Sequence, residues 1–341
     1  MLCTQDRTFI IMDLRSLHLN AIIYAMQLIT IIIPAYNEEE VLTPLLDRLK
    51  KLEKNVINYS FEFLFINDGS SDKTLEIIQN KRKVIKNISY VNLSRNYGKE
   101  IAMIAGLDHA RGDAVIIIDA DLQDPPELIP KMIDYWEQGF DDVYAKRRSR
   151  KGESWLKKST SGWFYIILQK LTHIPIQKDT GDFRLMSRRF VNALKTLRES
   201  ERYTKGMFSW VGFKKKEILY DRSPRVAGQT KWSYFKLFSL AIDGITSFTT
   251  IPLRIASVIG LVSSVAAFIY IVFLVFKTTF FGSDISGYPS IMAVILFLGG
   301  IQLLSLGIIG EYIGRIFHET KRRPLYFVEE YSFEKKYRQA K

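Results

Sequence analysis

The first part of the chain alternates short apolar runs with longer segments in which apolar residues recur every three or four positions. The short runs are rich in β-branched and aromatic residues, which is typical of buried strands. We predict strands at 28–34, 61–68, 88–93 and 113–119. We predict helices that begin near Glu39, Asp72, Lys99 and Glu127. Strands that alternate with helices form a mainly parallel sheet covered on both faces, so the pattern predicts an α/β fold.

The pattern is less regular in the middle of the chain. A short apolar run at 143–146 leads into a basic stretch at 146–158, for which we predict a mobile loop, and an aromatic helix follows at 162–171. A further strand is expected at 214–221. The apolar residues of 233–250 are spaced for an amphipathic helix, which would lie on a membrane surface or pack against the domain.

Two long segments near the end of the chain carry no charged residue, from 255 to 276 and from 289 to 310. At about 1.5 Å per residue, a helix of this length crosses a bilayer core of roughly 30 Å. The alternative, two buried helices of a soluble core, is disfavoured because such helices seldom lack a polar face over this length. We therefore predict a hairpin of two transmembrane helices within 251–318.

Lysine and arginine outnumber aspartate and glutamate by 48 to 36, which gives a net charge of +12. Many of the basic residues flank the apolar pair, whereas the connector between the two segments has one lysine and one aspartate. The flanking cations are Lys214, Lys215, Lys216, Arg222, Arg225, Lys231, Lys236, Arg254, Arg315, Lys321, Arg322 and Arg323. By the positive-inside rule, a domain at 26–232 and a basic tail at 319–341 face the cytoplasm. This distribution favours a membrane surface or an anionic lipid as the partner over nucleic acid.

The first 25 residues differ in pattern from the rest of the chain. Their apolar run is broken by Asp13 and Arg15, and no small-residue cleavage site comes after it, which argues against a signal peptide. Met26 stands directly before the first predicted strand, so we interpret 1–25 as an extension that precedes the native start. The only cysteine, Cys3, excludes an internal disulfide and fits a reducing compartment.

Each of the four predicted strands is followed by a polar segment: PAYNEE, NDGSSD, SRNYGK and DADLQD. In sheets of this kind, ligands bind outside the carboxyl ends of the strands. In the last segment, Asp119 and Asp121 offer two carboxylates, which suit Mg²⁺ or Mn²⁺ completed by phosphate oxygens. The tripeptide alone is equally consistent with a solvated acidic turn. Its place between a buried strand and a helix start favours a metal site.

The segment NDGSSD has two interpretations. Asp68 and Gly69 form a turn and the next residues cap a helix, which would make this an ordinary well-capped loop. Alternatively, Asp68 contacts a nucleobase or a ribose. The chain has neither G-x-G-x-x-G nor a P-loop sequence, so a bound diphosphate would be held in another way, which points back to the metal.

Six motifs occur in a fixed order before the apolar pair: IIIPAYNEEE, FINDGSSDKT, SRNYGKE, IDADLQDPPE, GDFRLMSRR and GQTKW. Together they resemble the family 2 glycosyltransferases of GT-A fold. More narrowly, they resemble bacterial polyprenyl-phosphate glycosyltransferases of the bactoprenol glucosyltransferase type, which are related to dolichyl-phosphate mannose synthase. The resemblance covers roughly 26–323 and implies a Rossmann-like, mainly parallel sheet followed by a two-helix transmembrane hairpin.

The resemblance also implies roles for the matching residues. The residues at nucleotide-sugar-binding positions are Pro34, Ala35, Tyr36, Glu38, Asp68, Lys99 and Asp119. The metal-binding positions, for Mg²⁺ or Mn²⁺, are Asp119, Asp121 and Gln123. The expected catalytic residues are Asp121, Asp182 and Arg184. The expected ligands of the acceptor phosphate are Arg184, Arg188 and Lys231.

In this family the sugar passes to a lipid phosphate with inversion. A phosphate monoester is already ionised near neutral pH, so a strong general base is not obviously needed. Asp182 is therefore expected either to accept a proton from a monoanionic acceptor or to orient Arg184. A purely structural pair of these two residues is a third interpretation.

We thus expect transfer of a hexose, glucose from UDP-glucose in the first place, to undecaprenyl phosphate. The reaction would take place on the cytoplasmic face of a bacterial plasma membrane, by a multi-pass protein that forms a homo-oligomer. GDP-mannose or another UDP-sugar is the alternative donor. A membrane sensor of nucleotide sugars and a lipid transporter are the alternatives outside enzymes. Two spans without an intramembrane charge offer no polar route for transport on their own, although oligomerisation could build one.

Overall fold

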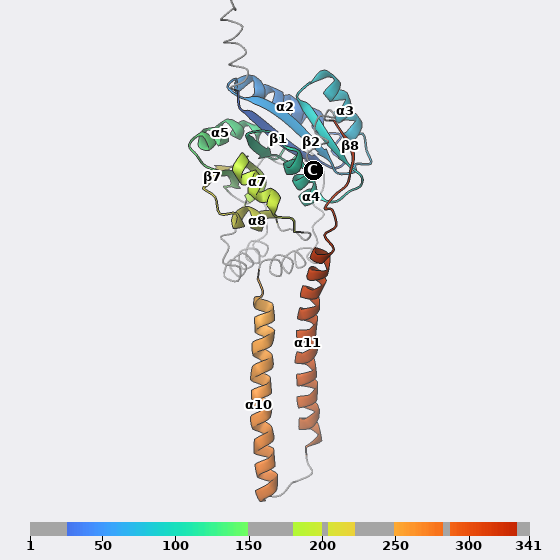
Figure 1. The fold of residues 1–341 in the computed structure, drawn as a ribbon, viewed down its shortest axis with the longest axis vertical. Coiled ribbons are helices and arrows are strands. Elements are labelled where there is room, and N and C mark those ends of the chain that lie inside the picture. The colour runs from blue at the N-terminus through green and yellow to red at the C-terminus, as the bar shows by residue number, and fades with distance from the viewer. Residues whose placement is uncertain (1–25, 149–179, 200–203, 222–248, 282–286, 333–341) are drawn as a thin grey trace, which may run out of the picture.

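The computed structural model describes residues 26–148, 180–199, 204–221, 249–281 and 287–332. An α/β domain is joined to two long helices that extend away from it (Figure 1). Some of the predicted segments fall outside the described residues and stay predictions: the extension at 1–25, most of the basic loop at 146–158, the aromatic helix at 162–171, most of the amphipathic helix at 233–250, and Lys231.

The domain is built on an eight-stranded sheet with the order β7-β5-β6-β4-β1-β2-β3-β8. The strands are β1 (Leu28–Ala35), β2 (Ser60–Asn67), β3 (Ile88–Leu93), β4 (Ala114–Ile117), β5 (Asp142–Arg147), β6 (Thr180–Ser187), β7 (Lys215–Tyr220) and β8 (Val328–Tyr331). The four central strands β4, β1, β2 and β3 run parallel, as the alternating pattern predicts. β6 runs antiparallel to both β4 and β5, and β8 runs antiparallel to β3. The predicted α/β fold with parallel central strands is therefore confirmed, and the antiparallel strands β6 and β8 make the complete sheet mixed.

Helices cover both faces of the sheet. They are α2 (Leu42–Asn55), α3 (Thr74–Val84), α4 (Lys99–His109), α5 (Ile129–Glu137) with the short 3₁₀ turn η1 (Pro126–Leu128) before it, α7 (Arg188–Thr196) and α8 (Thr204–Trp210). One buried apolar cluster joins α2, α3 and α5 to the sheet, and a second joins α4, α7 and α8 to the opposite face. Figure 1 shows α7 and α8 on the side of the sheet that faces the long helices.

Helix α4 lies unusually close to the sheet. A Cβ atom on Gly106 would come within 2.3 Å of the Ile32 side chain. Glycine at this position therefore sets the depth at which α4 packs. That depth matters because α4 begins at Lys99, beside the carboxyl ends of the central strands.

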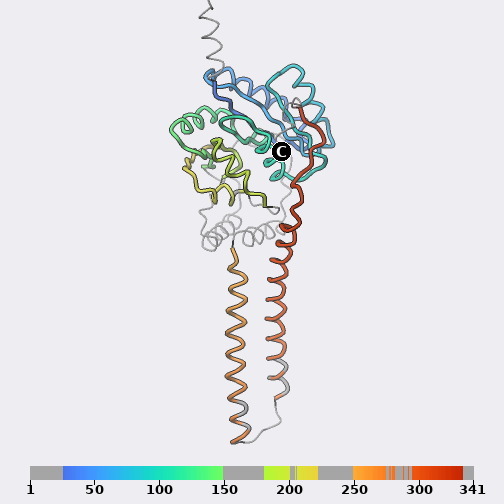
Figure 2. The backbone as a smooth tube through the Cα atoms, in the orientation of Figure 1, coloured from blue at the N-terminus to red at the C-terminus, as the bar shows by residue number. Residues whose placement is uncertain are grey.

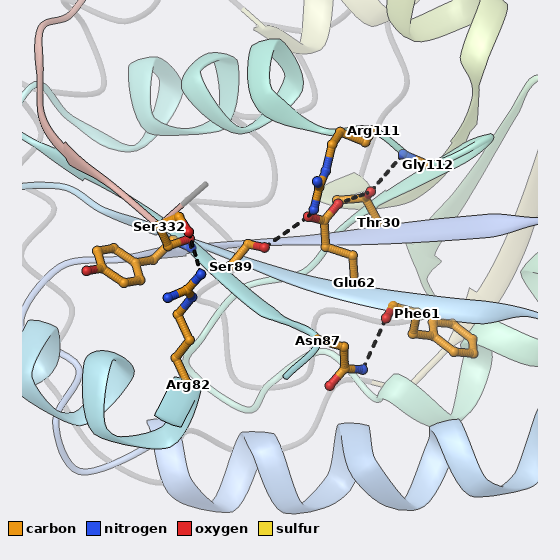
Figure 3. Close-up of polar contacts among 10 residues, drawn as sticks. Thr30, Phe61, Glu62, Arg82, Asn87, Ser89, Arg111, Gly112 and Ser332 are labelled. Carbon is orange, nitrogen blue, oxygen red and sulfur yellow. Dashed lines mark hydrogen bonds and ion pairs between the residues drawn. The ribbon is translucent and has the colours of Figure 1, made fainter. Parts of the chain in front are cut away.

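A charged side chain, Glu62, is buried on the central strand β2 (Figure 3). It accepts hydrogen bonds from Thr30 Oγ1 at 2.9 Å and Ser89 Oγ at 3.0 Å, on the two neighbouring strands. Arg111 forms an ion pair with it, and the Gly112 backbone N–H donates to Thr30. A buried carboxylate needs such partners because its unpaired burial is costly. These contacts stabilise the sheet near the amino ends of the strands, away from the carboxyl-end loops.

The two long helices are α10 (Ile251–Phe281) and α11 (Tyr288–Thr320). They lie side by side in the tube view (Figure 2), and the spans 251–273 and 294–320 are long and apolar enough to cross a membrane. Both helices extend beyond the predicted segments. At the domain end, the Tyr312 hydroxyl donates to the Thr249 carbonyl at 2.6 Å and ties the hairpin together.

The chain after α11 turns back onto the domain, which the prediction of a simple basic tail at 319–341 did not include. Figure 1 shows this segment running from the top of α11 along the domain to β8. There it extends the sheet next to β3, with Val91 opposite Tyr331 and Asn92 opposite Glu330. The part of the tail beyond residue 332 lies outside the described residues.

Candidate functional site

An open cleft lies at the carboxyl ends of the parallel strands and encloses about 800 Å³, including its mouth. It is lined by Pro34, Ala35, Tyr36, Glu38, Asp68, Asn96, Gly98, Lys99, Ala102, Asp119, Ala120 and Asp121. All seven predicted nucleotide-sugar positions are in this lining. They meet because the ends of parallel strands share one edge of the sheet, which brings together loops that are far apart in the chain. The lining also contains four residues that the sequence analysis did not identify as site residues: Asn96, Gly98, Ala102 and Ala120.

The loop after β1 is held in place by the loop after β2. The Asn37 backbone has a positive φ of 55°, and its N–H donates to Ser70 Oγ at 3.0 Å. The Asn37 side chain accepts a hydrogen bond from the Ser71 N–H at 2.9 Å, and the Glu38 N–H donates to Thr74 Oγ1 at 2.9 Å. These bonds leave Tyr36 in the cleft lining, where the residue is 46% exposed. A flat aromatic ring in this position can stack against a planar ligand.

Asp68 connects two of the cleft loops. Its carboxylate accepts hydrogen bonds from the Tyr97 N–H at 2.8 Å and the Gly98 N–H at 2.9 Å. Burial raises the pKa of Asp68, although these two bonds act in the opposite direction. Gly69 has a φ of 65°, and a Cβ there would lie 2.4 Å from the Arg95 carbonyl carbon. Lys73 occupies the N-cap position of helix α3 without a capping side-chain hydrogen bond, and the Asp72 carboxylate before it accepts from the Thr74 N–H at 3.0 Å.

Lys99 lies between two carboxylates, one in the loop after β4 and one on β6. Its Nζ atom is 2.7 Å from Asp119 Oδ1 and 2.5 Å from Asp182 Oδ2. Burial lowers the pKa of Lys99, but the two carboxylates outweigh it, and the net shift is upward. The ammonium therefore remains charged and joins the loop after β4 to the GDFRL segment on β6. Asp182 is within one side chain's reach of the predicted metal site.

The loop after β4 has a constrained geometry. Leu122 has a positive φ of 61°, which is uncommon for a residue with a branched side chain, and Asp121 Oδ1 accepts from the Gln123 N–H at 3.1 Å. Asp124 is 2% exposed and accepts from the Tyr220 hydroxyl at 2.8 Å. Burial, followed by the charge of Asp119, raises the pKa of Asp124 to about 6. Asp124 therefore anchors this loop to β7, a role that the sequence analysis did not assign.

The predicted metal ligands are compatible with a divalent cation that the substrate completes. Asp119 and Asp121 line the cleft. The Gln123 Oε1 atom is buried and, among the described residues, has no hydrogen-bond partner. No group of three histidine, cysteine or acidic side chains is arranged to hold a metal in the described part of the chain. The donor set suits Mg²⁺ or Mn²⁺ bound through few protein oxygens together with phosphate oxygens, and it does not suit a cage made of protein alone.

Arg184 has no exposed surface. Its Nη1 atom donates to Asp142 at 3.1 Å, and its guanidinium carbon lies 3.6 Å from the centre of the Phe208 ring. Its Nε and Nη2 atoms have no hydrogen-bond partner within the part of the chain that the structure describes. Arg184 thus pairs with Asp142 while Asp182 pairs with Lys99, so the structure does not support the interpretation that Asp182 orients Arg184. A role for Arg184 at the acceptor phosphate stays a prediction.

Arg188 requires a correction. Its Nε donates to the carbonyl of Gly112 at 2.7 Å, two residues before β4 begins, whereas Asp119 lies beyond the end of β4. The cause is the antiparallel pairing of β6 with β4, which carries the chain from Asp182 back toward the amino end of β4. Arg188 thus lies at the opposite edge of the sheet from the cleft, and its assignment to the acceptor phosphate is wrong.

Comparisons with known proteins agree with this architecture. Residues 30–194 match the model of glycosyl transferase family 2, and residues 251–316 match the model of the GtrB C-terminal hairpin. An uncharacterized glycosyltransferase of Synechocystis is 50% identical over 89% of this chain and 95% of its own length. A prophage bactoprenol glucosyl transferase homolog of Escherichia coli is 46% identical over 88% of this chain and 98% of its own length. The bactoprenol glucosyl transferase of Shigella phage SfX is 44% identical with the same coverage.

Proposed function

This chain belongs to the family 2 glycosyltransferases, and from that premise we propose that it transfers glucose from UDP-glucose to undecaprenyl phosphate or a similar polyprenyl phosphate. The observation that carries the proposal is the cleft at the carboxyl ends of the strands, where Lys99 joins Asp119 to Asp182. The names of the relatives from Shigella phage SfX and Escherichia coli support glucose as the sugar and bactoprenol as the lipid.

The donor lies in the cleft with its base near Tyr36 and its diphosphate near the start of α4. The first backbone N–H groups of a helix attract anions, and Lys99 adds a full positive charge at the same place. Asp119, Asp121 and Gln123 would hold Mg²⁺ or Mn²⁺, which supplies positive charge to the leaving diphosphate when it is bound. Because Lys99 forms an ion pair with Asp119, a bound diphosphate gives Lys99 a competing anionic partner.

The transfer requires a phosphate oxygen of the lipid to reach the anomeric carbon of the sugar. A bond forms between these two atoms while the bond to the nucleoside diphosphate breaks, and attack from the opposite side inverts the configuration. A dianionic acceptor has no proton to lose. For a monoanionic acceptor, the Asp182 carboxylate takes the proton, and Lys99 holds that carboxylate at the cleft. Positioning and charge stabilisation thus carry the reaction.

The hairpin places this reaction at a membrane. The two apolar helices and the matching hairpin model indicate a membrane-associated enzyme. We propose that both helices cross a bacterial plasma membrane and that the basic flanks hold the catalytic domain on its cytoplasmic face. The acceptor phosphate then lies at headgroup level below α7 and α8, on the side of the domain from which the hairpin extends (Figure 1). A homo-oligomer is part of the same proposal.

The test is transfer of label from a panel of UDP- and GDP-sugars to undecaprenyl phosphate by the purified full chain in detergent. We expect one chelator-sensitive lipid product, from UDP-glucose. An Asp121→Asn variant should form much less product than wild type at the same Mg²⁺ concentration, whereas Asp134→Asn on helix α5 serves as a matched control. If only GDP-mannose gave a product, GDP-mannose would be the donor instead of UDP-glucose. The absence of any lipid product with folded protein would refute the proposal.

A further inference from the structure

The segment after α11, residues 321–332, is attached to the domain along its path, and we name it the strap. Its backbone pairs with β3, and its side chains form further hydrogen bonds with side chains of β3. Glu330 accepts from the Tyr90 hydroxyl at 2.6 Å, and Glu329 accepts from the Asn92 amide at 2.9 Å. At its far end, the Ser332 carbonyl accepts a hydrogen bond from Arg82 (Figure 3). These contacts make the strap a folded part of the domain.

The near end of the strap touches a loop of the donor cleft. We name residues 94–98, between β3 and α4, the donor loop, because Asn96 and Gly98 line the cleft and Lys99 comes directly after them. The Ser94 N–H donates to the Phe327 carbonyl at 3.0 Å. In return, the Phe327 N–H donates to the Tyr97 hydroxyl at 3.3 Å, and that hydroxyl is also 3.0 Å from Ser94 Oγ.

The donor loop is therefore held from two sides. On the cleft side, the Asp68 carboxylate binds the N–H groups of Tyr97 and Gly98. On the outer side, the strap binds Ser94 and the Tyr97 hydroxyl. The first three residues of the loop are exposed, whereas Tyr97 packs against the apolar cluster that contains α4. Hydrogen bonds therefore decide where the exposed part of the loop lies.

We infer that the strap positions the donor loop, and that Tyr97 is the positioning residue through which it acts. This inference rests on the proposed function, because it assigns the loop to donor binding. Tyr97 does not have to touch the donor. Its hydroxyl holds the loop so that the Tyr97 and Gly98 N–H groups stay on Asp68 and Lys99 stays between Asp119 and Asp182.

The attachment also relates the cleft to the hairpin. Six residues separate Thr320, the end of α11, from Phe327. A donor loop that is tied to Phe327 is thus completed only after the chain has passed through both long helices and returned. Strand β8 thus follows the hairpin in the sequence, but the strap that contains it supports the donor loop between β3 and α4.

The test uses Tyr97→Phe, which removes the hydroxyl and keeps the ring that packs under Arg95 at 4.0 Å. The matched control is Tyr331→Phe on the strap itself, since no hydrogen bond of the Tyr331 hydroxyl is found among the described residues. Amide hydrogen exchange should speed up in the peptide that contains 94–98 in Tyr97→Phe and stay unchanged in the control. Exchange in β1 and β2 should be unchanged in both variants.

Binding and kinetics provide the second measurement. With wild type, UDP should bind in the presence of Mg²⁺, and Tyr97→Phe should weaken this binding and raise the donor KM by about three- to tenfold. The acceptor KM, kcat and the melting temperature should stay near wild type, a split that a general loss of structure would not produce. Wild-type protein that binds no nucleotide would overturn the proposed function. Normal UDP affinity and normal exchange in Tyr97→Phe would overturn only the role of the strap.

Discussion

Removing the hydroxyl of Tyr220 tests whether the loop after β4 depends on its anchor. In Tyr220→Phe, the buried carboxylate of Asp124 loses the donor that lies 2.8 Å away. A hydrogen bond to a charged group contributes about 1.5–3 kcal/mol, whereas one between neutral groups contributes about 0.5–1.5 kcal/mol. The cost of the substitution therefore depends on whether Asp124 is ionised.

The pH dependence follows from the pKa of Asp124. Burial raises this pKa to about 6, so the carboxyl is mostly neutral at pH 5 and mostly ionised at pH 8. A raised carboxyl pKa means that the folded state is favoured at low pH and loses stability as the pH rises through about 6. The Tyr220 hydroxyl offsets part of that loss because it stabilises the ionised form of Asp124. Its removal should therefore lower the stability of the folded state most above pH 6.

The assay is thermal unfolding of the full chain in detergent at pH 5 and pH 8. For a domain of this size, 1 kcal/mol shifts the melting temperature by roughly 2–4 °C. We expect Tyr220→Phe to lower it by roughly 3–12 °C at pH 8 and by about half of that or less at pH 5. Tyr331 is 48% exposed, so Tyr331→Phe should change the melting temperature little at either pH. Equal losses at the two pH values would refute the reasoning that an ionised Asp124 needs this donor.

Three further substitutions probe the cleft. Gly69→Ala places a Cβ against the donor loop at a φ of 65°, so it should lower the free energy of unfolding by more than about 2 kcal/mol. Gly139→Ala is the control, because Gly139 also has a positive φ but open space around it, and it should cost less. Lys99→Met removes the cation beside Asp182 and should lower kcat/KM for the donor about 100-fold, with melting temperature as the check on folding. Asp121→Asn should raise the Mg²⁺ concentration for half-maximal activity at least about tenfold, and an unchanged metal requirement would remove Asp121 from the metal site.

Much of the donor side of the cleft could be predicted from the sequence because it depends on local order. A strand that ends in PAYNEE or DADLQD carries its polar residues to its own carboxyl end, and parallel strands share that edge. The residues at the carboxyl ends of these strands, among them Pro34, Asp68 and Asp121 in the cleft lining, must therefore gather at one edge if the strands are parallel. The contact between Asp68 and the donor loop could not be predicted, because it depends on how closely two neighbouring loops approach.

The acceptor side was harder to predict because it depends on the direction of β6. In a parallel strand, Arg188 would have followed Asp182 toward the cleft. The antiparallel pairing of β6 with β4 instead carries Arg188 to the far edge of the sheet and leaves Asp182 beside Lys99. No local pattern in GDFRLMSRR reports that direction, since a strand has the same alternation whichever way it pairs.

The sequence by itself determined the α/β class, the strand-end position of the donor residues and the two apolar helices, because each follows from the pattern of apolar and polar residues among neighbours in the chain. Only the tertiary structure decided three features: the Lys99 bridge between Asp119 and Asp182, the burial of Arg184 against Asp142, and the return of the strap to β3. These features join residues that are distant in the chain. Their geometry is set by packing and by strand direction, which a linear pattern does not encode.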